Sequence, residues 1–139
     1  MKTLIVLGVL CMTVQTLNAS GQPRSAVWIG AATYYTVASA KSEGTSGVLT
    51  ASGKPYKESL LTCALPFKPP AVNGKRKWGL KYQVTNLSNG KRVIVSHLDL
   101  GPGRKAQSRG VIIDLTPAAF RALGGKLRDG RIKVRVEKI

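Results

Sequence analysis

The sequence predicts a small, mostly β domain that closes into a barrel and carries one or two short helices. Short β-rich runs separated by turn residues recur along the 139-residue chain, a length typical of one domain. Asn89-Gly90 lies between two such runs and is a strong hairpin signal. Cys63 is the single cysteine after the N-terminal leader, so no internal disulfide can form and the domain depends on its apolar core. A closed barrel builds such a core without open sheet edges.

Residues 1–20 have the features of a secretory signal peptide, and residues 21–139 are expected to form the folded domain. Lys2 supplies the positive charge, Leu4–Val14 is a short apolar core, and Asn18–Gly21 provides small residues for cleavage. The apolar core is too short to span a bilayer, and no later segment is long and apolar enough. We therefore expect a secreted or periplasmic, cell-envelope protein that is monomeric and has no membrane span once the signal is removed.

Each expected secondary-structure element is predicted by residue types within or next to it in the sequence. The runs rich in β-branched and aromatic residues are bounded by turn residues, and the last run alternates apolar and charged residues. Thr116-Pro117 is expected to begin a helix, and Gly124-Gly125 to end it. Ser39–Gly47 is expected to be a loop and Pro66–Gly79 a long connection. The expected strands are Val27–Val37 with a break at Gly30, Leu60–Leu65, Leu80–Thr85, Arg92–Val95, Val111–Ile113 and Ile132–Val136.

The formal net charge of +16 predicts attraction to a polyanion. Nucleic acid is the first candidate for a basic chain in the cytoplasm, but an exported protein meets the anionic polymers of the envelope instead. Peptidoglycan, teichoic acid and lipopolysaccharide are such polymers, and we expect one of them, not nucleic acid, as the partner. The alternative is that the charge serves only solubility. The sequence has no Cys/His cluster and no phosphate loop, so we expect no metal and no cofactor.

Asp99 is the clearest candidate for chemistry because it follows a β-rich run and stands just ahead of the tight turn at Gly101-Pro102. If the strand that starts at Arg92 extends this far, the side chains of His97 and Asp99 share one face. An acid displayed in this way can protonate a glycosidic oxygen, and the histidine can hold its proton or bind sugar. The alternative is a turn acid beside a loop histidine, which is a common arrangement.

The chain contains six short motifs: Tyr34-Tyr35, Thr50–Gly53, Leu65–Phe67, Val84–Gly90, Asp99–Pro102 and Gly110–Thr116. In this order and at this spacing they resemble the double-psi β-barrel domain of the rare lipoprotein A family, which is related to expansins and barwin-like endoglucanases. The resemblance implies a six-stranded barrel that acts on peptidoglycan glycan strands, with Asp99 as the catalytic acid. His97-Leu98-Asp99 also resembles the His-Phe-Asp motif of the relatives. Asp114 matches a family position that we interpret as structural, hydrogen-bonded near the helix start or across the barrel.

Three positions depart from the family's pattern, and one of them is Leu100, where the family has an Arg directly after the catalytic acid. Lys54 stands where the family commonly has a Glu, and Thr62 and Cys63 occupy the region where it has a His. Exposed aromatic rings can stack on sugars, although core packing is the alternative for at least two of them. The basic triplet Lys75–Lys77 can contact peptide-stem carboxylates, or it is simply a solvated loop. The expected substrate-binding residues are His97, Tyr34, Tyr35, Lys54 and Trp78, and the expected structural residues near the site are Asp114, Gly101 and Pro102.

The number of candidate catalytic carboxylates in the sequence favours one type of reaction. Hydrolysis of a glycoside ordinarily needs two carboxylates, whereas a lytic transglycosylase can use one Asp as acid and then base while the sugar's own hydroxyl attacks. With Asp99 as the one clear candidate, we expect an endolytic peptidoglycan transglycosylase that leaves 1,6-anhydro ends. The alternative is a non-catalytic, expansin-like module that binds and loosens wall polysaccharide. An exported toxin or inhibitor on the same barrel is a weaker third reading, because such plant defence proteins have many cysteines.

Overall fold

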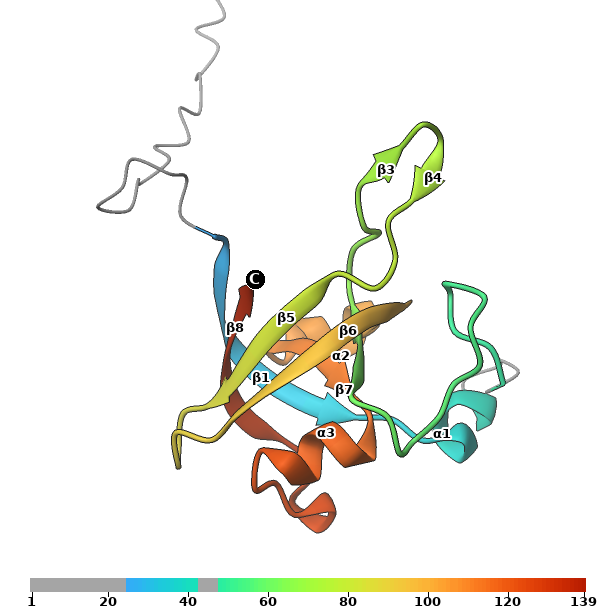
Figure 1. Ribbon diagram of the computed structural model, residues 1–139. Helices are drawn as coiled ribbons and strands as arrows, with labels where there is room; N and C mark the ends of the chain where they lie inside the picture. Colours follow the sequence, from blue (N-terminus) through green and yellow to red (C-terminus); the bar gives the residue numbers. More distant parts are fainter. Residues whose placement is uncertain (1–24, 43–47) are drawn as a thin grey trace, which may run out of the picture.

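The structure, a computed structural model, describes residues 25–42 and 48–139, so the expected signal peptide lies outside the described residues. Six strands form a closed barrel in the order β1-β7-β2-β6-β5-β8, which confirms the predicted six-stranded barrel (Figure 1). Two further strands, β3 and β4, form a separate small sheet. The strands are β1 (Val27–Tyr34), β2 (Thr62–Leu65), β3 (Ala71–Val72), β4 (Lys75–Arg76), β5 (Lys81–Asn86), β6 (Arg92–Leu100), β7 (Val111–Leu115) and β8 (Ile132–Lys138).

The barrel mixes parallel and antiparallel pairing. β1 pairs with β7 and β2 pairs with β6 in parallel, whereas the other neighbours are antiparallel. Parallel partners cannot be joined by a tight turn, so each such pair is connected through other parts of the domain. The predicted hairpin joins β5 to β6 through Gly90, whose φ of 74° is one that glycine adopts without strain. β1 runs without a break through Gly30, where a Cβ atom would lie 2.6 Å from the side chain of Ile112.

Three short α-helices and one 3-10 turn surround the barrel. They are α1 (Val37–Ser42), α2 (Arg104–Ser108), α3 (Pro117–Ala122) and η1 (Leu127–Asp129). α3 is the predicted helix, with the Thr116 hydroxyl accepting the N–H of Ala119. α1 corrects the expectation that Ser39–Gly47 is a loop throughout, and residues 43–47 lie outside the described residues. The backbone N–H groups of Thr36 and Ser39 each donate to the other's hydroxyl, a reciprocal cap that favours a helix start here.

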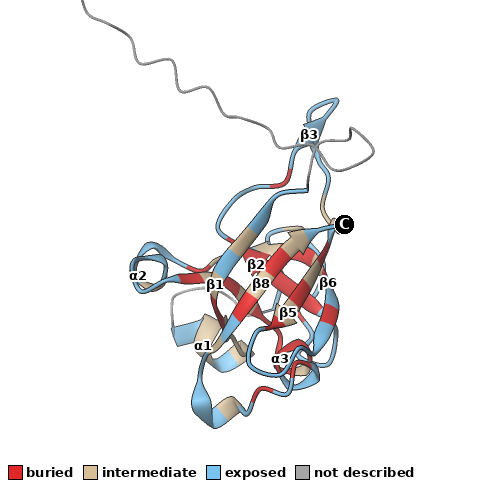
Figure 2. Cartoon of the chain, turned by 90° about the vertical axis from the view of Figure 1, so that its left-hand side faces the viewer, coloured by how far each residue is buried: buried red, intermediate tan, exposed pale blue. Residues whose placement is uncertain are grey.

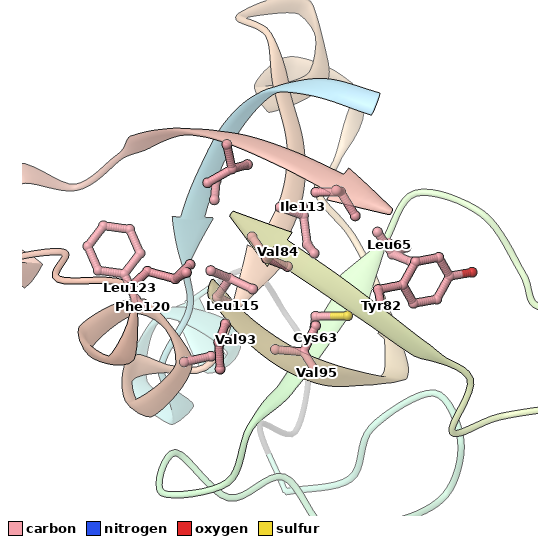
Figure 3. Close-up of a cluster of buried hydrophobic side chains, with 14 residues drawn as sticks. Cys63, Leu65, Tyr82, Val84, Val93, Val95, Ile113, Leu115, Phe120 and Leu123 are labelled. Carbon is pink, nitrogen blue, oxygen red and sulfur yellow. The ribbon is translucent and has the colours of Figure 1, made fainter. Parts of the chain in front are cut away.

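The apolar core fills the barrel interior. Val134 and Val136 of β8 point inward, at 0% and 1% exposure, as their alternation with charged residues predicts. Cys63 lies fully buried among them, and burial raises the pKa of its thiol, so the prediction of a small buried apolar residue is confirmed. Figure 2 shows buried positions concentrated along the barrel strands and exposed ones in the loops and the β3–β4 hairpin. Figure 3 shows the interior side chains of Cys63, Leu65, Tyr82, Val84, Val93, Val95, Ile113, Leu115, Phe120 and Leu123.

The long connection Pro66–Gly79 contains the hairpin of β3 and β4, which stands clear of the barrel in Figure 1. Its turn residues, Asn73 and Gly74, both have left-handed backbone angles, with φ of 50° and 72°. This Asn-Gly pair is the preferred sequence for a tight two-residue hairpin turn. None of the helices in the described part of the chain has the length and apolar character needed to span a membrane.

Candidate functional site

A pocket of about 690 Å³ opens where the ends of β1, β2, β6 and β7 meet α1 and α2. Two carboxylates, Asp99 and Asp114, line it together with several aromatic rings and one cation, Lys68. The remaining lining residues are Thr33, Tyr34, Tyr35, Ser39, Ala40, Leu49, Tyr56, Ala64, Pro66, Phe67, Leu100, Gly101, Pro102, Gly103 and Ala106. A pocket with an acidic wall, flanked by rings and backbone polar groups, suits a neutral sugar chain.

Four register partners form a row across the barrel wall at this pocket. Thr33 of β1 pairs with Asp114 of β7, Asp114 pairs with Ala64 of β2, and Ala64 pairs with Asp99 of β6. Neighbouring strands are about 4.8 Å apart, so the Cα atoms of the two acids are roughly 10 Å apart. Ala64, between the two acids, also lines the pocket but is itself 2% exposed, and Gly101 packs closely against it and Asp114. The sequence gives no sign of this arrangement, because the two acids are brought together by pairing among non-consecutive strands.

Asp99 is held in place by three hydrogen bonds. Its Oδ1 accepts the backbone N–H groups of Ala51 and Leu100, each at 2.9 Å, and its Oδ2 accepts the Tyr35 hydroxyl at 3.1 Å. The Ala51 contact exists because the turn Thr50–Gly53 lies against the end of β6, where the Ser52 N–H donates to the Leu98 carbonyl at 3.0 Å. The sequence identifies this turn as a motif but does not predict its contact with Asp99, which lies 48 residues away from Ala51.

Asp114 is a residue of the barrel sheet, and it also lines the pocket. The Thr33 hydroxyl donates to its Oδ1, a bond between neighbouring strands that agrees with the expected hydrogen-bonded role. Its Oδ2 lies so close to Gly101 that a Cβ atom there would approach within 3.2 Å. Gly101 and Pro102, expected as structural residues near the site, both line the pocket and are joined by a cis peptide bond. Asp114 was expected near the site in a structural role only, and its position among the pocket residues makes it a second candidate for chemistry.

Tyr35 and Tyr56 form a stacked pair beside Asp99, with ring centroids 4.6 Å apart. The Tyr56 hydroxyl donates to the backbone carbonyl of Tyr35. Burial, together with the negative charge of Asp99, raises the pKa of Tyr35, and burial with the charge of Glu58 raises the pKa of Tyr56. Both phenols therefore keep their protons at neutral pH, and Tyr35 acts as a hydrogen-bond donor to the carboxylate.

His97 does not share a face with Asp99, which corrects the expectation from their spacing. Cys63 pairs with His97 and Ala64 with Asp99, so Leu98 is the extra residue of a β-bulge that breaks the alternation. The His97 ring is fully buried, so direct contact with a sugar is excluded in this structure. Its Nε2–H donates to the backbone carbonyl of Asp99 at 3.0 Å, not to the carboxylate. Burial lowers the pKa of His97.

The other expected substrate-binding residues occupy different places. Tyr34 lines the pocket, but its hydroxyl donates to the carbonyl of Leu127 at 2.9 Å and its ring packs on Phe120. Trp78 packs against the His97 ring at 5.2 Å and Lys54 is exposed, and neither is among the residues that line the pocket. Their sugar-binding roles stay predictions. Within residues 25–42 and 48–139, no group of three His, Cys, Asp or Glu side chains is arranged to hold a metal ion.

Several curated proteins resemble the chain in sequence, including the following two. The probable endolytic peptidoglycan transglycosylase RlpA of Nostoc sp. is 33% identical over 111 residues, which cover 78% of this chain and 24% of that protein. The endolytic peptidoglycan transglycosylase RlpA of Pasteurella multocida is 36% identical over 138 residues, which cover 97% of this chain and 38% of that protein. The chain therefore spans well under half the length of these relatives. No family model matches the chain.

Solved structures of similar shape include an inhibitor and an expansin. The Streptomyces papain inhibitor has a TM-score of 0.60 and 23% identity, covering 83% of this chain and 96% of its own. Apo expansin of Clavibacter michiganensis has a TM-score of 0.55 and 24% identity, covering 82% of this chain and 50% of its own. A variant of that expansin in complex with cellohexaose has a TM-score of 0.54 and 22% identity, covering 82% of this chain and 50% of its own. At these identities the likeness shows the fold alone.

Proposed function

This chain belongs to the rare lipoprotein A-like double-psi β-barrel family, and we propose that it cleaves the glycan strands of peptidoglycan as a lytic transglycosylase in the cell envelope. The observation that carries the proposal is the position of Asp99, whose carboxylate lines an open pocket and is held by Ala51, Leu100 and Tyr35. The names of the curated relatives support peptidoglycan as the substrate.

In the proposed reaction Asp99 acts first as acid and then as base. Its Oδ1 accepts two backbone N–H groups, whereas its Oδ2 accepts one hydroxyl, so we assign the transferable proton to Oδ2. The proton passes to the glycosidic oxygen as the bond to the anomeric carbon breaks. The carboxylate then takes the proton of the sugar's own primary hydroxyl, which attacks the same carbon and closes the anhydro ring. Tyr35 keeps the acid in position through both steps.

Asp114 gives the pocket a second negative charge, which the sequence argument lacked. Positive charge develops at the anomeric carbon in the transition state, and a carboxylate across the pocket stabilises it. Two carboxylates also meet the usual requirement for hydrolysis, in which one of them activates a water molecule. The single-acid argument for a transglycosylase is therefore weaker than the sequence indicated, and the choice over a hydrolase rests on the relatives' names.

Mass spectrometry of the soluble products from purified peptidoglycan tests the proposal. We expect fragments with anhydro ends from the wild-type protein and a loss of at least about a hundredfold in rate for Asp99→Asn. Asp114→Asn is expected to reduce the rate, and Asp129→Asn is the matched control, because Asp129 is exposed on η1 and is not among the pocket residues. Reducing ends instead of anhydro ends would identify a hydrolase. Wild-type rates in Asp99→Asn would refute the catalytic role of Asp99.

A non-catalytic binding module is the second candidate. Lys54 replaces the Glu that relatives commonly have, and no histidine occurs at Thr62 or Cys63. A module of this kind would bind peptidoglycan without releasing fragments, and its binding would be the same in wild type and Asp99→Asn. The product assay therefore separates the two candidates.

A further inference from the structure

A second cavity, of about 230 Å³, adjoins the pocket of Asp99 and has no part in the proposed reaction. Pro66 and Phe67 line both spaces. Two consecutive residues of α2 line one space each, Ala106 the pocket and Gln107 the second cavity. The two spaces are therefore neighbours with the Pro66-Phe67 segment in their common wall. The second space is called the side cavity from here on.

The side cavity is apolar apart from one amide, that of Gln107. The other side chains that line it are aliphatic or aromatic and come from four barrel strands and the segment after β2, among them Trp28, Leu65, Val111 and Ile112. Within residues 25–42 and 48–139, no charged side chain lines it. An ion buried in such a space without a partner loses its hydration and gains nothing in return. The lining therefore favours an uncharged, mostly apolar group over a carboxylate or a phosphate.

Two aromatic rings form a rigid part of this lining. Trp28 and Phe67 pack on each other with ring centroids 5.7 Å apart. Trp28 also packs on the buried Tyr82 ring at 6.2 Å, and Phe67 packs on the buried His97 ring at 5.7 Å. Each ring is thus fixed by contact with a core side chain, and neither is itself fully buried. A fixed ring surface binds a methyl group with little loss of entropy.

Gln107 supplies the polar group of the side cavity. Its Nε2 donates to the carbonyl of Pro102 at 2.9 Å, and this bond fixes the orientation of the amide. The other atom of the amide, Oε1, is an acceptor with two lone pairs. We therefore assign Oε1 as the acceptor for an N–H group bound in the side cavity.

The volume of the side cavity limits what it can hold. Sites for whole small-molecule ligands measure about 300–1,000 Å³, and the side cavity, at about 230 Å³, is smaller. It suits one substituent of a ligand whose main body lies elsewhere, and the adjoining pocket of about 690 Å³ has room for that body. An acetamido group matches the lining, because its methyl group is apolar and its N–H is a hydrogen-bond donor.

We propose that the side cavity is a subsite for the 2-acetamido group of one sugar in a glycan strand whose neighbouring sugars occupy the pocket of Asp99. The methyl group packs against Trp28 and Phe67, and the N–H donates to Gln107 Oε1. This inference rests on the proposed function, since both sugars of peptidoglycan carry an acetamido group at carbon 2. It goes further in assigning the residues that distinguish such a strand from a glucan, which has a hydroxyl group at that carbon.

Binding of two neutral hexasaccharides tests the inference. Chitohexaose and cellohexaose have the same β-1,4-linked backbone and differ in whether carbon 2 carries an acetamido or a hydroxyl group. All proteins in the test carry Asp99→Asn, so that binding is measured without cleavage. Gln107→Leu removes the amide from an exposed position on α2. Gln83→Leu is the matched control, because Gln83 lies on β5 and lines neither the pocket nor the side cavity.

We expect Asp99→Asn to bind chitohexaose at least about tenfold more tightly than cellohexaose, because a site shaped for a substituent discriminates against an analogue that lacks it. Adding Gln107→Leu should weaken chitohexaose binding by about fivefold and leave cellohexaose binding unchanged. Adding Gln83→Leu should change neither. Equal affinity for the two sugars, no binding of chitohexaose, or an equal loss for both sugars in Gln107→Leu would each overturn the inference.

The two tryptophans of the chain report where the acetamido group binds. Trp28 lines the side cavity, whereas Trp78 lines neither space. In NMR spectra of Asp99→Asn, chitohexaose should shift the indole N–H signal of Trp28 much more than cellohexaose does, and the Trp78 signal should shift little. The spectrum of Trp78→Phe assigns the two signals. A Trp28 signal that does not respond to chitohexaose would contradict the subsite. Release of anhydro fragments from peptidoglycan is a separate measurement, so failure of the proposed reaction is distinguishable from failure of the subsite.

Discussion

Asp99 and Asp114 lie on strands at either side of β2, and both are register partners of the same residue, Ala64. This relationship explains how one pocket receives two carboxylates from positions 15 residues apart in sequence. Each acid has its own donor from the segment around the end of β1: the Thr33 hydroxyl for Asp114 and the Tyr35 hydroxyl for Asp99. Because each acid has a different hydroxyl donor, substituting one donor tests one acid at a time.

Tyr35→Phe removes the hydroxyl that donates to Asp99 Oδ2 and leaves the ring that stacks on Tyr56. A hydrogen bond to a charged group contributes about 1.5–3 kcal/mol, so we expect cleavage to slow by roughly tenfold or more. The rate of release of anhydro fragments measures this effect. Tyr82→Phe is the control, because Tyr82 lies on β5 and is not among the pocket residues. Equal rates in the two variants would contradict a positioning role for the Tyr35 hydroxyl.

Thr33→Val replaces the hydroxyl that donates to Asp114 with a methyl group of similar shape. Loss of this donor in a partly buried position is expected to lower the free energy of unfolding by about 1–3 kcal/mol. Cleavage should fall as well, because the carboxylate is no longer held toward the pocket. Urea unfolding and product release are the two measurements. Thr85→Val, on β5 and not among the pocket residues, is the control and should change neither by a comparable amount.

Gly101→Ala tests the close approach between the β6 end and Asp114. The φ of 147° at Gly101 is unfavourable for any residue with a Cβ atom, and that atom would lie 3.2 Å from Asp114 Oδ2. We expect a loss of about 1–3 kcal/mol in the free energy of unfolding. Gly103→Ala is the matched control, since a Cβ atom there meets nothing within 4 Å. The prediction fails if the two variants have the same unfolding midpoint.

His97 predicts a specific dependence of stability on pH. Burial lowers its pKa below the ordinary value of 6.5, so the unfolded chain takes up a proton at a pH where the folded chain does not. The unfolded state then binds more protons, and stability falls as the pH drops below about 6.5. Chemical unfolding between about pH 7.5 and pH 5.5 measures the slope, which spans the titration of an unperturbed histidine.

His97→Gln supplies the control for that measurement. His97 is the single histidine of the chain, so the substitution removes the one side chain that ordinarily titrates in this range. The variant is expected to show a flatter dependence of unfolding free energy on pH, even if its stability at pH 7.5 is lower. An unchanged slope would show that another group is responsible.

Local sequence signals were sufficient for much of the fold. The Asn89-Gly90 turn, the Thr116-Pro117 helix start and the alternation of β8 each depend on contacts between residues close in sequence, and each was confirmed. α1 was missed because Ser and Gly are common in loops, whereas the reciprocal cap of Thr36 and Ser39 was not recognised. The start of β2 at Thr62 instead of Leu60 reflects exposure of Leu60 and Leu61, which composition alone does not predict.

The candidate site also combines features that the sequence predicts with features that depend on the tertiary structure. Residue type and near neighbours were enough to predict a buried Cys63 and a basic surface, whereas Asp99 and its Gly-Pro turn were selected through their resemblance to a family motif. Only the tertiary structure placed Asp114 opposite Asp99, brought the Ala51 N–H to the carboxylate and turned His97 into the interior. Those three outcomes depend on strand register and on one β-bulge, which are set by packing between segments far apart in the chain, and no local pattern specifies them.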